Sequence, residues 1–326
     1  MIEIETHTEF LRFRYPFRIA HGERLGTDVV FVVLRKQGLV GYGEATLPPY
    51  LGVTTEHVLQ ALSRPGIVDS LELSNPDDWF ESLHSIIPDN MPALAALDMA
   101  RWQIELAERN QGLDSVLGYA ENSRVPHTFT LGVSGKKEME AKVRFANDLG
   151  FNFFKLKLNG KNDRDMISFF RELSNAPFAI DANQAWAVLQ QGLDVLDMLE
   201  REGCVLIEQP FHKGDRMLTK KLSEKTDIPI IADEACRQIE ELDDVLQSFD
   251  GVNVKLQKCG GITPAIKQLR KIKTVGKNAL IGCMSESSIG CNAAEQLTFL
   301  CDWADLDGPY LNANNIELCQ KIGYSL

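Results

Sequence analysis

The chain has 326 residues, which corresponds to about two domains. Its 46 acidic and 34 basic residues give a formal net charge of −12, and no basic block occurs. This composition excludes a typical nucleic-acid-binding protein. No run of about 20 apolar residues and no apolar N-terminal segment occur, so neither a membrane span nor a signal peptide is expected. The seven cysteines have no CxxC spacing, which favours free thiols in a reducing cytoplasm over disulfides or a zinc site.

The chain before residue 121 is predicted to form a small α+β domain. Residues 2–13 alternate loosely between polar and apolar side chains and Val29–Arg35 is a β-branched run, so both are expected to be strands. Gly41–Glu44 is expected to return as part of a hairpin. The apolar residues of Met91–Asn110 recur at helical spacing, which predicts a helix. Strands followed by helices are typical of an α+β domain.

After residue 120 a short apolar strand and an amphipathic helix alternate, with successive strands about 20 to 27 residues apart. Strands that are apolar on both faces and alternate with helices indicate a parallel sheet covered by helices. Eight such units favour a closed barrel over an open doubly wound sheet, and no glycine-rich nucleotide-binding motif occurs. The expected strands are His127–Gly132, Phe153–Lys157, Phe178–Asp181, Val205–Glu208, Ile230–Asp233, Val252–Leu256, Leu280–Cys283 and Trp303–Leu306.

We therefore predict an α/β fold with two domains. Residues 121–308 are expected to form a modified TIM barrel, (β/α)7β-like, that carries the catalytic site at its mouth. Residues 1–120 are expected to form the α+β domain.

Acidic residues lie at the ends of three neighbouring strands. Asp181, Glu208 and Asp233 occur within I-D-A-N, I-E-Q-P and A-D-E. Because the carboxyl ends of parallel barrel strands meet at the mouth, these side chains are expected to converge. A single acid there could simply cap a helix or pair with a surface lysine, but three converging anions repel one another unless a cation neutralises them. Three carboxylate ligands suit magnesium rather than zinc.

Lysines are expected on both sides of the three acids. Lys155 and Lys157 share one side of the second barrel strand, and Lys255 lies on the sixth strand, across the mouth. A lysine acts as a base only when its pKa is lowered, and Lys155 supplies a neighbouring cation to Lys157. A divalent cation would stabilise an enediolate formed when a proton leaves the carbon next to a carboxylate. Two opposed bases could then remove and return that proton, which predicts racemisation or epimerisation.

The ordered motifs at the strand ends resemble the enolase superfamily, and within it the muconate-lactonising-enzyme subgroup. The chemistry of a lysine base with a magnesium-stabilised enediolate is that of the superfamily. The resemblance covers nearly the whole chain, and A-D-L-D-G-P is most similar to the dipeptide epimerases. The motifs are F-R-I-A-H-G-E-R-L-G, G-Y-G-E-A, A-L-D-M-A-R-W, K-L-K, D-A-N-Q, E-Q-P, A-D-E, V-K-L-Q-K-C-G-G, G-C-M-S-E-S-S and A-D-L-D-G-P.

The resemblance implies a Mg²⁺-dependent 1,1-proton transfer that epimerises the α-carbon of the second residue of a dipeptide, L-Ala-D/L-Glu or a related one. It makes the three acids the Mg²⁺ ligands and Lys157 and Lys255 the two acid/base residues. Lys155 would modulate Lys157 and touch the substrate carboxylate. The implied partner is a small dipeptide, with no nucleic acid or membrane, and a homo-oligomeric assembly is left open.

The resemblance also implies a set of substrate-binding residues. Asp305 and Asp307 would receive the α-ammonium of a dipeptide, although an Asp-Gly pair at this point also favours a turn. Arg24 matches the arginine that binds a side-chain carboxylate in Glu-specific members, and Met284 lies in the seventh-strand segment linked to substrate choice. The resemblance further implies that residues 1–120 form a capping domain, whose loops around Arg24 and at Leu47–Thr54 would form a lid that excludes water. The tail, about residues 309–326, would pack back on this capping domain.

Four other functions fit part of the pattern. A relative of mandelate racemase or of the acid-sugar dehydratases needs a histidine base near the sixth or seventh strand, but after residue 120 the histidines are His127 and His212. An N-acylamino acid racemase or o-succinylbenzoate synthase keeps the metal and lysines but does not need Asp305 and Asp307. Muconate cycloisomerase has a dianionic substrate, which this pair would repel. A non-catalytic ligand-binding barrel would tolerate losses among the six metal and lysine positions, and all six are present.

Overall fold

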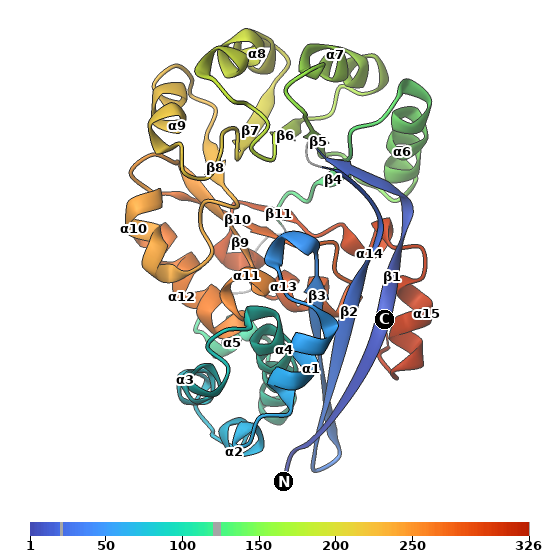
Figure 1. The fold of residues 1–326 in the computed structure, drawn as a ribbon, viewed down its shortest axis with the longest axis vertical. Coiled ribbons are helices and arrows are strands. Elements are labelled where there is room, and N and C mark those ends of the chain that lie inside the picture. Colours follow the sequence, from blue (N-terminus) through green and yellow to red (C-terminus); the bar gives the residue numbers. More distant parts are fainter. Residues whose placement is uncertain (20–21, 120–124, 326) are drawn as a thin grey trace.

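The computed structural model describes residues 1–19, 22–119 and 125–325. Within these residues the strands form a three-stranded antiparallel sheet and an eight-stranded parallel sheet (Figure 1), which confirms the predicted α/β barrel with an N-terminal α+β part. The predicted boundary at residues 120–121 lies outside the described residues, as do Ala20 and His21 of the first family motif. No helix in the described part of the chain is both long and apolar enough to cross a membrane.

The N-terminal sheet pairs its strands in the order β1 (Glu3–Ile19), β2 (Gly22–Lys36) and β3 (Leu39–Leu47). The predicted β-branched run lies in β2 and is buried on both faces of the sheet. One face packs against α4 (Met91–Arg109), and the other packs against α15 (Asn315–Lys321) near the C-terminus. This double burial explains why the run is continuously apolar rather than alternating.

β1 is longer than the predicted strand at residues 2–13. Its pairing with β2 is interrupted after Arg12 and resumes at Phe17, which lies opposite Arg24. Pro16 lies in the interruption and has no backbone N–H to donate to a neighbouring strand. The alternating pattern therefore fades in the sequence although the strand continues.

The predicted helix at residues 91–110 is α4. The side chain of Asn90 accepts a hydrogen bond from the Ala93 N–H at its start, and Asn110 adopts a left-handed conformation (φ 50°) at its end. α4 packs along β3 and supports the whole N-terminal sheet. The other helical segments of this part are η1 (Pro49–Leu51), α1 (Thr55–Leu62), α2 (Ile67–Leu71), α3 (Pro76–Ile86) and α5 (Leu113–Val116).

Gly43 marks the closest approach of β3 to α4. A Cβ atom at this position would lie 1.8 Å from the backbone oxygen of Ala96. Gly43→Ala is therefore expected to push the strand away from the helix and to lower the free energy of unfolding by about 3 kcal/mol, the upper end of the usual cost of overpacking. Urea unfolding followed by circular dichroism measures this loss. Gly214→Ala is the control, because a Cβ there meets no atom closer than 3.4 Å, and equal stability of the two variants would contradict the tight packing.

The barrel strands follow one another in chain order around the sheet, each parallel to the next. A parallel bridge joins His127 to Ala304, and the Thr128 N–H donates to Ala304 O at 2.9 Å, so the two edges of the sheet meet. The carboxyl ends of the strands therefore surround one mouth. The strands are β4 (Phe129–Leu131), β5 (Phe154–Lys157), β6 (Phe178–Asp181), β7 (Cys204–Glu208), β8 (Ile230–Ala232), β9 (Gly251–Lys255), β10 (Asn278–Gly282) and β11 (Trp303–Asp305).

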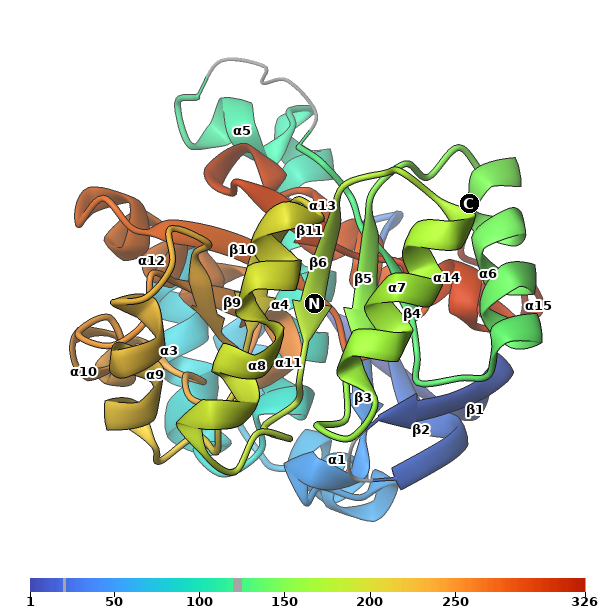
Figure 2. The ribbon, with the colours of Figure 1, turned by 90° about the horizontal axis from the view of Figure 1, so that it is seen from above.

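Helices lie outside the barrel strands, as Figures 1 and 2 show for α6, α7 and α8. They cover the outward apolar faces that the sequence showed on these strands. The helical segments of this part are α6 (Lys136–Asp148), α7 (Asp163–Leu173), α8 (Leu189–Arg201), α9 (Arg216–Ser223), η2 (Ile239–Glu241), α10 (Leu242–Val245), α11 (Leu256–Cys259), α12 (Ile262–Thr274), α13 (Ser288–Glu295), η3 (Thr298–Leu300) and α14 (Gly308–Leu311).

After β11 the chain returns to the N-terminal sheet. The Ala313 N–H donates to Arg12 O at 2.7 Å, and the Tyr42 hydroxyl donates to Gly323 O at 2.8 Å. Helix α15 fills the face of the sheet opposite α4. The C-terminal segment thus contacts both β1 and β3 of the N-terminal sheet.

Candidate active site

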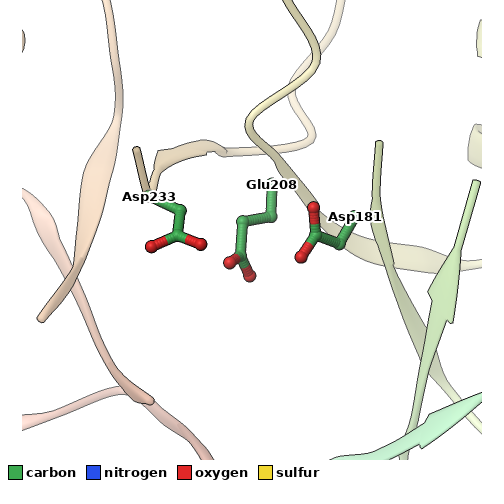
Figure 3. Close-up of side chains that lie close together, drawn as sticks. All are labelled: Asp181, Glu208 and Asp233. Carbon is green, nitrogen blue, oxygen red and sulfur yellow. The ribbon is translucent and has the colours of Figure 1, made fainter. Parts of the chain in front are cut away.

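Three acidic side chains meet at the mouth of the barrel. Asp181 ends β6, Glu208 ends β7 and Asp233 directly follows β8, and all three are buried. Figure 3 shows their side chains next to one another, and one carboxylate oxygen from each lies within 4.8 Å of the others. Parallel pairing of neighbouring strands produces this arrangement, because it brings the strand ends into register.

Two lysines from β5 enter this acidic group from one side. Lys155 Nζ lies 2.8 Å from Glu208 Oε2 and 3.2 Å from Asp181 Oδ2. Lys157 Nζ lies 2.5 Å from Asp181 Oδ2. The period of two along a strand places both ammonium groups on the same side of β5, as the sequence predicts.

Lys255 approaches the acids from the other side. It ends β9, and its Nζ lies 2.8 Å from Asp233 Oδ2. Strands β6, β7 and β8 separate β5 from β9, so Lys157 and Lys255 flank the acidic group. The two ammonium groups thus face one site from opposite strands.

The carboxylates determine the protonation of these lysines. Burial alone would lower the pKa of Lys155, but Asp305, Glu208 and Asp181 outweigh it and hold the pKa well above its usual value. The pKa of Lys255 is also well above its usual value, because Asp233 outweighs burial. Asp233 therefore holds Lys255 in its ammonium form, and Lys255 can accept a proton only when this pairing is released.

The donor set fits a magnesium ion. Burial raises the pKa of Glu208 to about 7, with Asp181 and Asp233 adding repulsion that Lys155 only partly offsets. The raised pKa means that the charged form of Glu208 is poorly stabilised by its protein surroundings, and a hard divalent cation would stabilise it. Buried carboxylate oxygens of this kind are the ligands Mg²⁺ takes in proteins.

Lys258 is a functional candidate that the sequence analysis missed. Its Nζ donates to Asp233 Oδ1 at 2.9 Å and also to the backbone oxygens of Asp233, Cys236 and Asn253 at 2.7 to 3.0 Å. Its side chain is buried, and its ammonium holds Asp233 Oδ1 while Lys255 pairs with Asp233 Oδ2. The signal available in the sequence is a second lysine three residues after Lys255, in an otherwise apolar stretch.

A cavity of about 320 Å³ opens beside the acids. Both flanking lysines reach it, so a bound molecule would contact the two ammonium groups together. Segments 22–24 and 48–50 of the N-terminal part and segment 283–285 of the barrel complete its walls. The lining residues are Phe17, Gly22, Glu23, Arg24, Pro48, Pro49, Tyr50, Lys157, Asn183, Asp233, Glu234, Lys255, Cys283, Met284 and Ser285.

Arg24 lies in the cavity wall with an unused donor. Its guanidinium carbon is 5.4 Å from the ring centroid of Phe13 and 5.7 Å from that of Phe17. Its Nη1 is buried and has no hydrogen-bond partner among the described residues, and burial lowers the pKa of the guanidinium. A half-buried cation with a buried, free donor favours an anionic group in the cavity.

Met284 lines the cavity and contacts one of the N-terminal segments. The Tyr50 hydroxyl donates to Met284 Sδ at 2.7 Å, so a residue of the 48–50 segment touches the barrel wall directly. Tyr50 was not singled out in the sequence, where a tyrosine between prolines and leucine has no distinctive spacing.

Asp305 and Asp307 lie deeper than the cavity wall. Asp305 ends β11 and accepts hydrogen bonds from Lys155 at 2.7 Å and from the Thr128 hydroxyl at 2.6 Å. Asp307 accepts one from the Thr130 N–H, and burial together with Asp305 raises its pKa to about 7. Neither residue is among those that line the cavity. The structure thus pairs Asp305 with Lys155 and Asp307 with the backbone of Thr130.

Two family profiles match most of the chain. Residues 1–118 match the mandelate racemase / muconate lactonizing enzyme N-terminal domain, and residues 138–306 match the enolase C-terminal domain-like family. The L-Ala-D/L-Glu epimerase of Bacteroides thetaiotaomicron is 32% identical over 305 residues, which cover 94% of this chain and 79% of that protein.

Solved structures of similar proteins share both parts of the fold. The N-succinyl Arg/Lys racemase from Bacillus cereus has a TM-score of 0.87 at 26% identity, covering 96% of this chain and 88% of that chain. A dipeptide epimerase from Enterococcus faecalis, complexed with Mg and the dipeptide L-Leu-L-Tyr, has a TM-score of 0.83 at 27% identity, covering 95% of this chain and 91% of that chain. Because the matches extend over both parts of the chain, this protein belongs to the mandelate racemase/muconate lactonizing enzyme family of the enolase superfamily.

Proposed function

We propose that the chain is a Mg²⁺-dependent epimerase that inverts the α-carbon of the second residue of a dipeptide. The observation that carries this proposal is the placement of Lys157 and Lys255 on opposite sides of one cavity that also contains Asp233. One base alone suffices for proton exchange, but inversion requires a proton donor on the face opposite the acceptor. The relatives that act on dipeptides support the substrate class.

In this mechanism Asp181, Glu208 and Asp233 hold the Mg²⁺. When bound, the ion supplies electrostatic stabilisation of the negative charge that develops on the substrate carboxylate. Lys157 and Lys255 act in turn, one taking the α-proton as a neutral amine and the other donating a proton as an ammonium. Their spacing across the cavity keeps the two transfers on opposite faces of the carbon.

The domains divide these tasks. We propose that residues 121–308 form the catalytic domain and that residues 1–120 form a cap whose 22–24 and 48–50 segments exclude water from the cavity. The seven cysteines are unpaired, which agrees with action in a reducing cytoplasm.

The proposed substrate carries an acidic side chain on its second residue, because Arg24 offers a buried, unpaired donor. Arg24→Met keeps an unbranched, flexible side chain but removes its charge-assisted hydrogen bonds, which contribute roughly 1.5–3 kcal/mol. The value of kcat/KM for L-Ala-L-Glu is therefore expected to fall by about 10- to 150-fold. Steady-state kinetics with L-Ala-L-Glu and L-Ala-L-Leu measure the effect.

The neutral dipeptide is the control in this comparison. L-Ala-L-Leu should be epimerised by Arg24→Met at least as fast as by the wild type, since it presents no anion to Arg24. An equal loss for both substrates would show that Arg24 shapes the cavity without reading the side chain, and the preference for an acidic residue would lose its support.

A second candidate function is racemisation of an N-acylated amino acid. The burial of Asp305 and Asp307 away from the cavity wall favours it, because such a substrate has no ammonium for these acids to bind. Incubation in D₂O of a free-amino dipeptide library and of N-succinyl amino acids, followed by mass spectrometry, separates the two. Deuterium incorporation only into the N-succinyl compounds would overturn the dipeptide assignment.

A further inference from the structure

A short loop after β10 forms the barrel wall of the cavity. Within 283–287, Met284 and Ser285 line the cavity, and Ser285 has a left-handed backbone (φ 69°) that residues other than glycine rarely adopt. The side chain of Asn312 holds this loop: its Nδ2 donates to Ser285 O at 2.9 Å and to Glu286 O at 3.0 Å. Asn312 is only 2% exposed. These two bonds oppose relaxation of the strained loop.

The backbone of the same residue contacts the other wall. Asn312 forms an antiparallel bridge with Phe13 of β1, and the neighbouring Ala313 N–H donates to Arg12 O at 2.7 Å. The ring of Phe13 packs against the guanidinium of Arg24, which lines the same cavity as Met284. Asn312 thus lies between the segment that carries Met284 and the strand that supports Arg24.

The next asparagine strengthens the contact with β1. Asn314 Oδ1 accepts a hydrogen bond from the Arg12 N–H at 2.9 Å, and its Nδ2 donates to Phe10 O at 3.0 Å. This side-chain amide bonds the backbone of β1 as a neighbouring strand would, directly before the pairing of β1 with β2 is interrupted. The tail therefore fixes the strand immediately before the stretch that supports Arg24.

The Oδ1 atom of Asn312 is buried and has no hydrogen-bond partner in the described part of the chain, which costs stability. This cost indicates that the side chain serves to hold the loop through its Nδ2 donors. We propose that Asn312 is a positioning residue that sets the separation of the Met284 and Arg24 walls and thereby the selectivity for the side chain of the substrate's second residue. This inference rests on the proposed dipeptide epimerase function.

Asn312→Ala removes both hydrogen bonds to the loop and is expected to let the Met284 wall move outward. The ratio of kcat/KM for L-Ala-L-Glu to that for L-Ala-L-Phe should fall by about tenfold, because the wider cavity accepts the bulky ring and separates the acidic side chain from Arg24. The affinity for Mg²⁺, measured by calorimetry, should not change, because Asn312 contacts none of the three acids.

Asn315→Ala is the matched control. Asn315 is similarly buried, and its amide makes two hydrogen bonds with Ser288 at 2.8 Å and accepts one from the Cys319 thiol at 3.7 Å. Neither partner lines the cavity. It should lower the melting temperature to a similar extent and leave the substrate ratio unchanged. If Asn312→Ala does not fold, Asn312→Ser, whose hydroxyl is too short to reach both carbonyl oxygens, replaces it in the same test.

The results separate the two proposals. An unchanged ratio in the Asn312 variant, or the same change in Asn315→Ala, would overturn the positioning role while leaving epimerisation itself intact. If the wild type epimerises no dipeptide, the proposed function fails first. A changed ratio in Asn312→Ala alone is the result expected from its contacts with both walls.

Discussion

Lys255→Ala is expected to reduce epimerisation by about 10⁴-fold, the upper end of the contribution of a single acid/base group. Lys255 Nζ faces the cavity from β9 while Lys157 faces it from β5, so each ammonium serves one face of the α-carbon. The variant should retain exchange of the α-proton with solvent for one epimer, through Lys157. Lys157→Ala should show the same behaviour with the other epimer. Chiral chromatography and ¹H NMR in D₂O measure inversion and exchange separately.

Lys213→Ala is the control for these variants, because Lys213 is exposed. Its backbone N–H donates a hydrogen bond to Gln184, and none of the three acids is its partner in that bond. It should have wild-type activity. If either Lys157→Ala or Lys255→Ala still interconverts the epimers at near the wild-type rate, two opposed lysine bases do not carry the reaction.

Loss of the metal site is the second large effect expected. Glu208→Gln preserves the shape of the side chain. It also keeps an acceptor for the Asn253 amide, which donates a hydrogen bond to Glu208 Oε1 at 2.9 Å, but it removes the charge of one of the three proposed ligands. Mg²⁺ affinity is expected to fall by about 100-fold or more, and turnover by about 10³-fold, since the ion contributes several kcal/mol of charge stabilisation. Calorimetric titration measures the affinity, and turnover is assayed at saturating Mg²⁺. EDTA should abolish wild-type activity, and added Mg²⁺ should restore it.

The fold of Glu208→Gln is expected to remain intact. Burial raises the pKa of Glu208 to about 7, so its carboxylate is poorly stabilised and a neutral amide reduces repulsion from Asp181 and Asp233. Lys155 loses its ion pair with Glu208 but keeps those with Asp181 and Asp305. Asp233→Asn is the informative comparison, because Asp233 pairs with both Lys255 and Lys258. Breaking these buried pairs should cost about 3–5 kcal/mol. Equal thermal stability of the two variants without metal would contradict this distribution of charge.

The barrel could be predicted because each of its strands is marked by a short apolar run in the sequence. β6 has the bounds expected from the sequence, since its three apolar residues and the acid that ends it form one buried strand. Asp181, Glu208 and Asp233 could be predicted to meet for the same reason: parallel strands bring successive ends to one mouth. The second half of β1 could not be predicted, because its pairing resumes only after an interruption that contains Pro16.

The parts of the site that depend on distant contacts were not accessible from the sequence. Lys258 becomes functional only because the turn after β8 wraps its carbonyl groups around the ammonium. Tyr50 reaches Met284 across two domains, and no spacing in the sequence encodes that approach. The role of Asp305 in binding the substrate ammonium stays a prediction, whereas its contact with Lys155, which joins β11 to β5, could not be predicted from spacing along the chain.

The most direct test of this account follows the two α-protons of L-Ala-L-Glu in D₂O by ¹H NMR, with the wild-type protein in Mg²⁺ and in EDTA. With Mg²⁺, the α-proton signal of the glutamyl residue should disappear as L-Ala-D-Glu forms, while the alanyl α-proton remains. In EDTA neither change should occur. Exchange at the glutamyl carbon that is equally fast without a divalent cation, or exchange without any inversion, would contradict a metal-dependent epimerase with two opposed lysines.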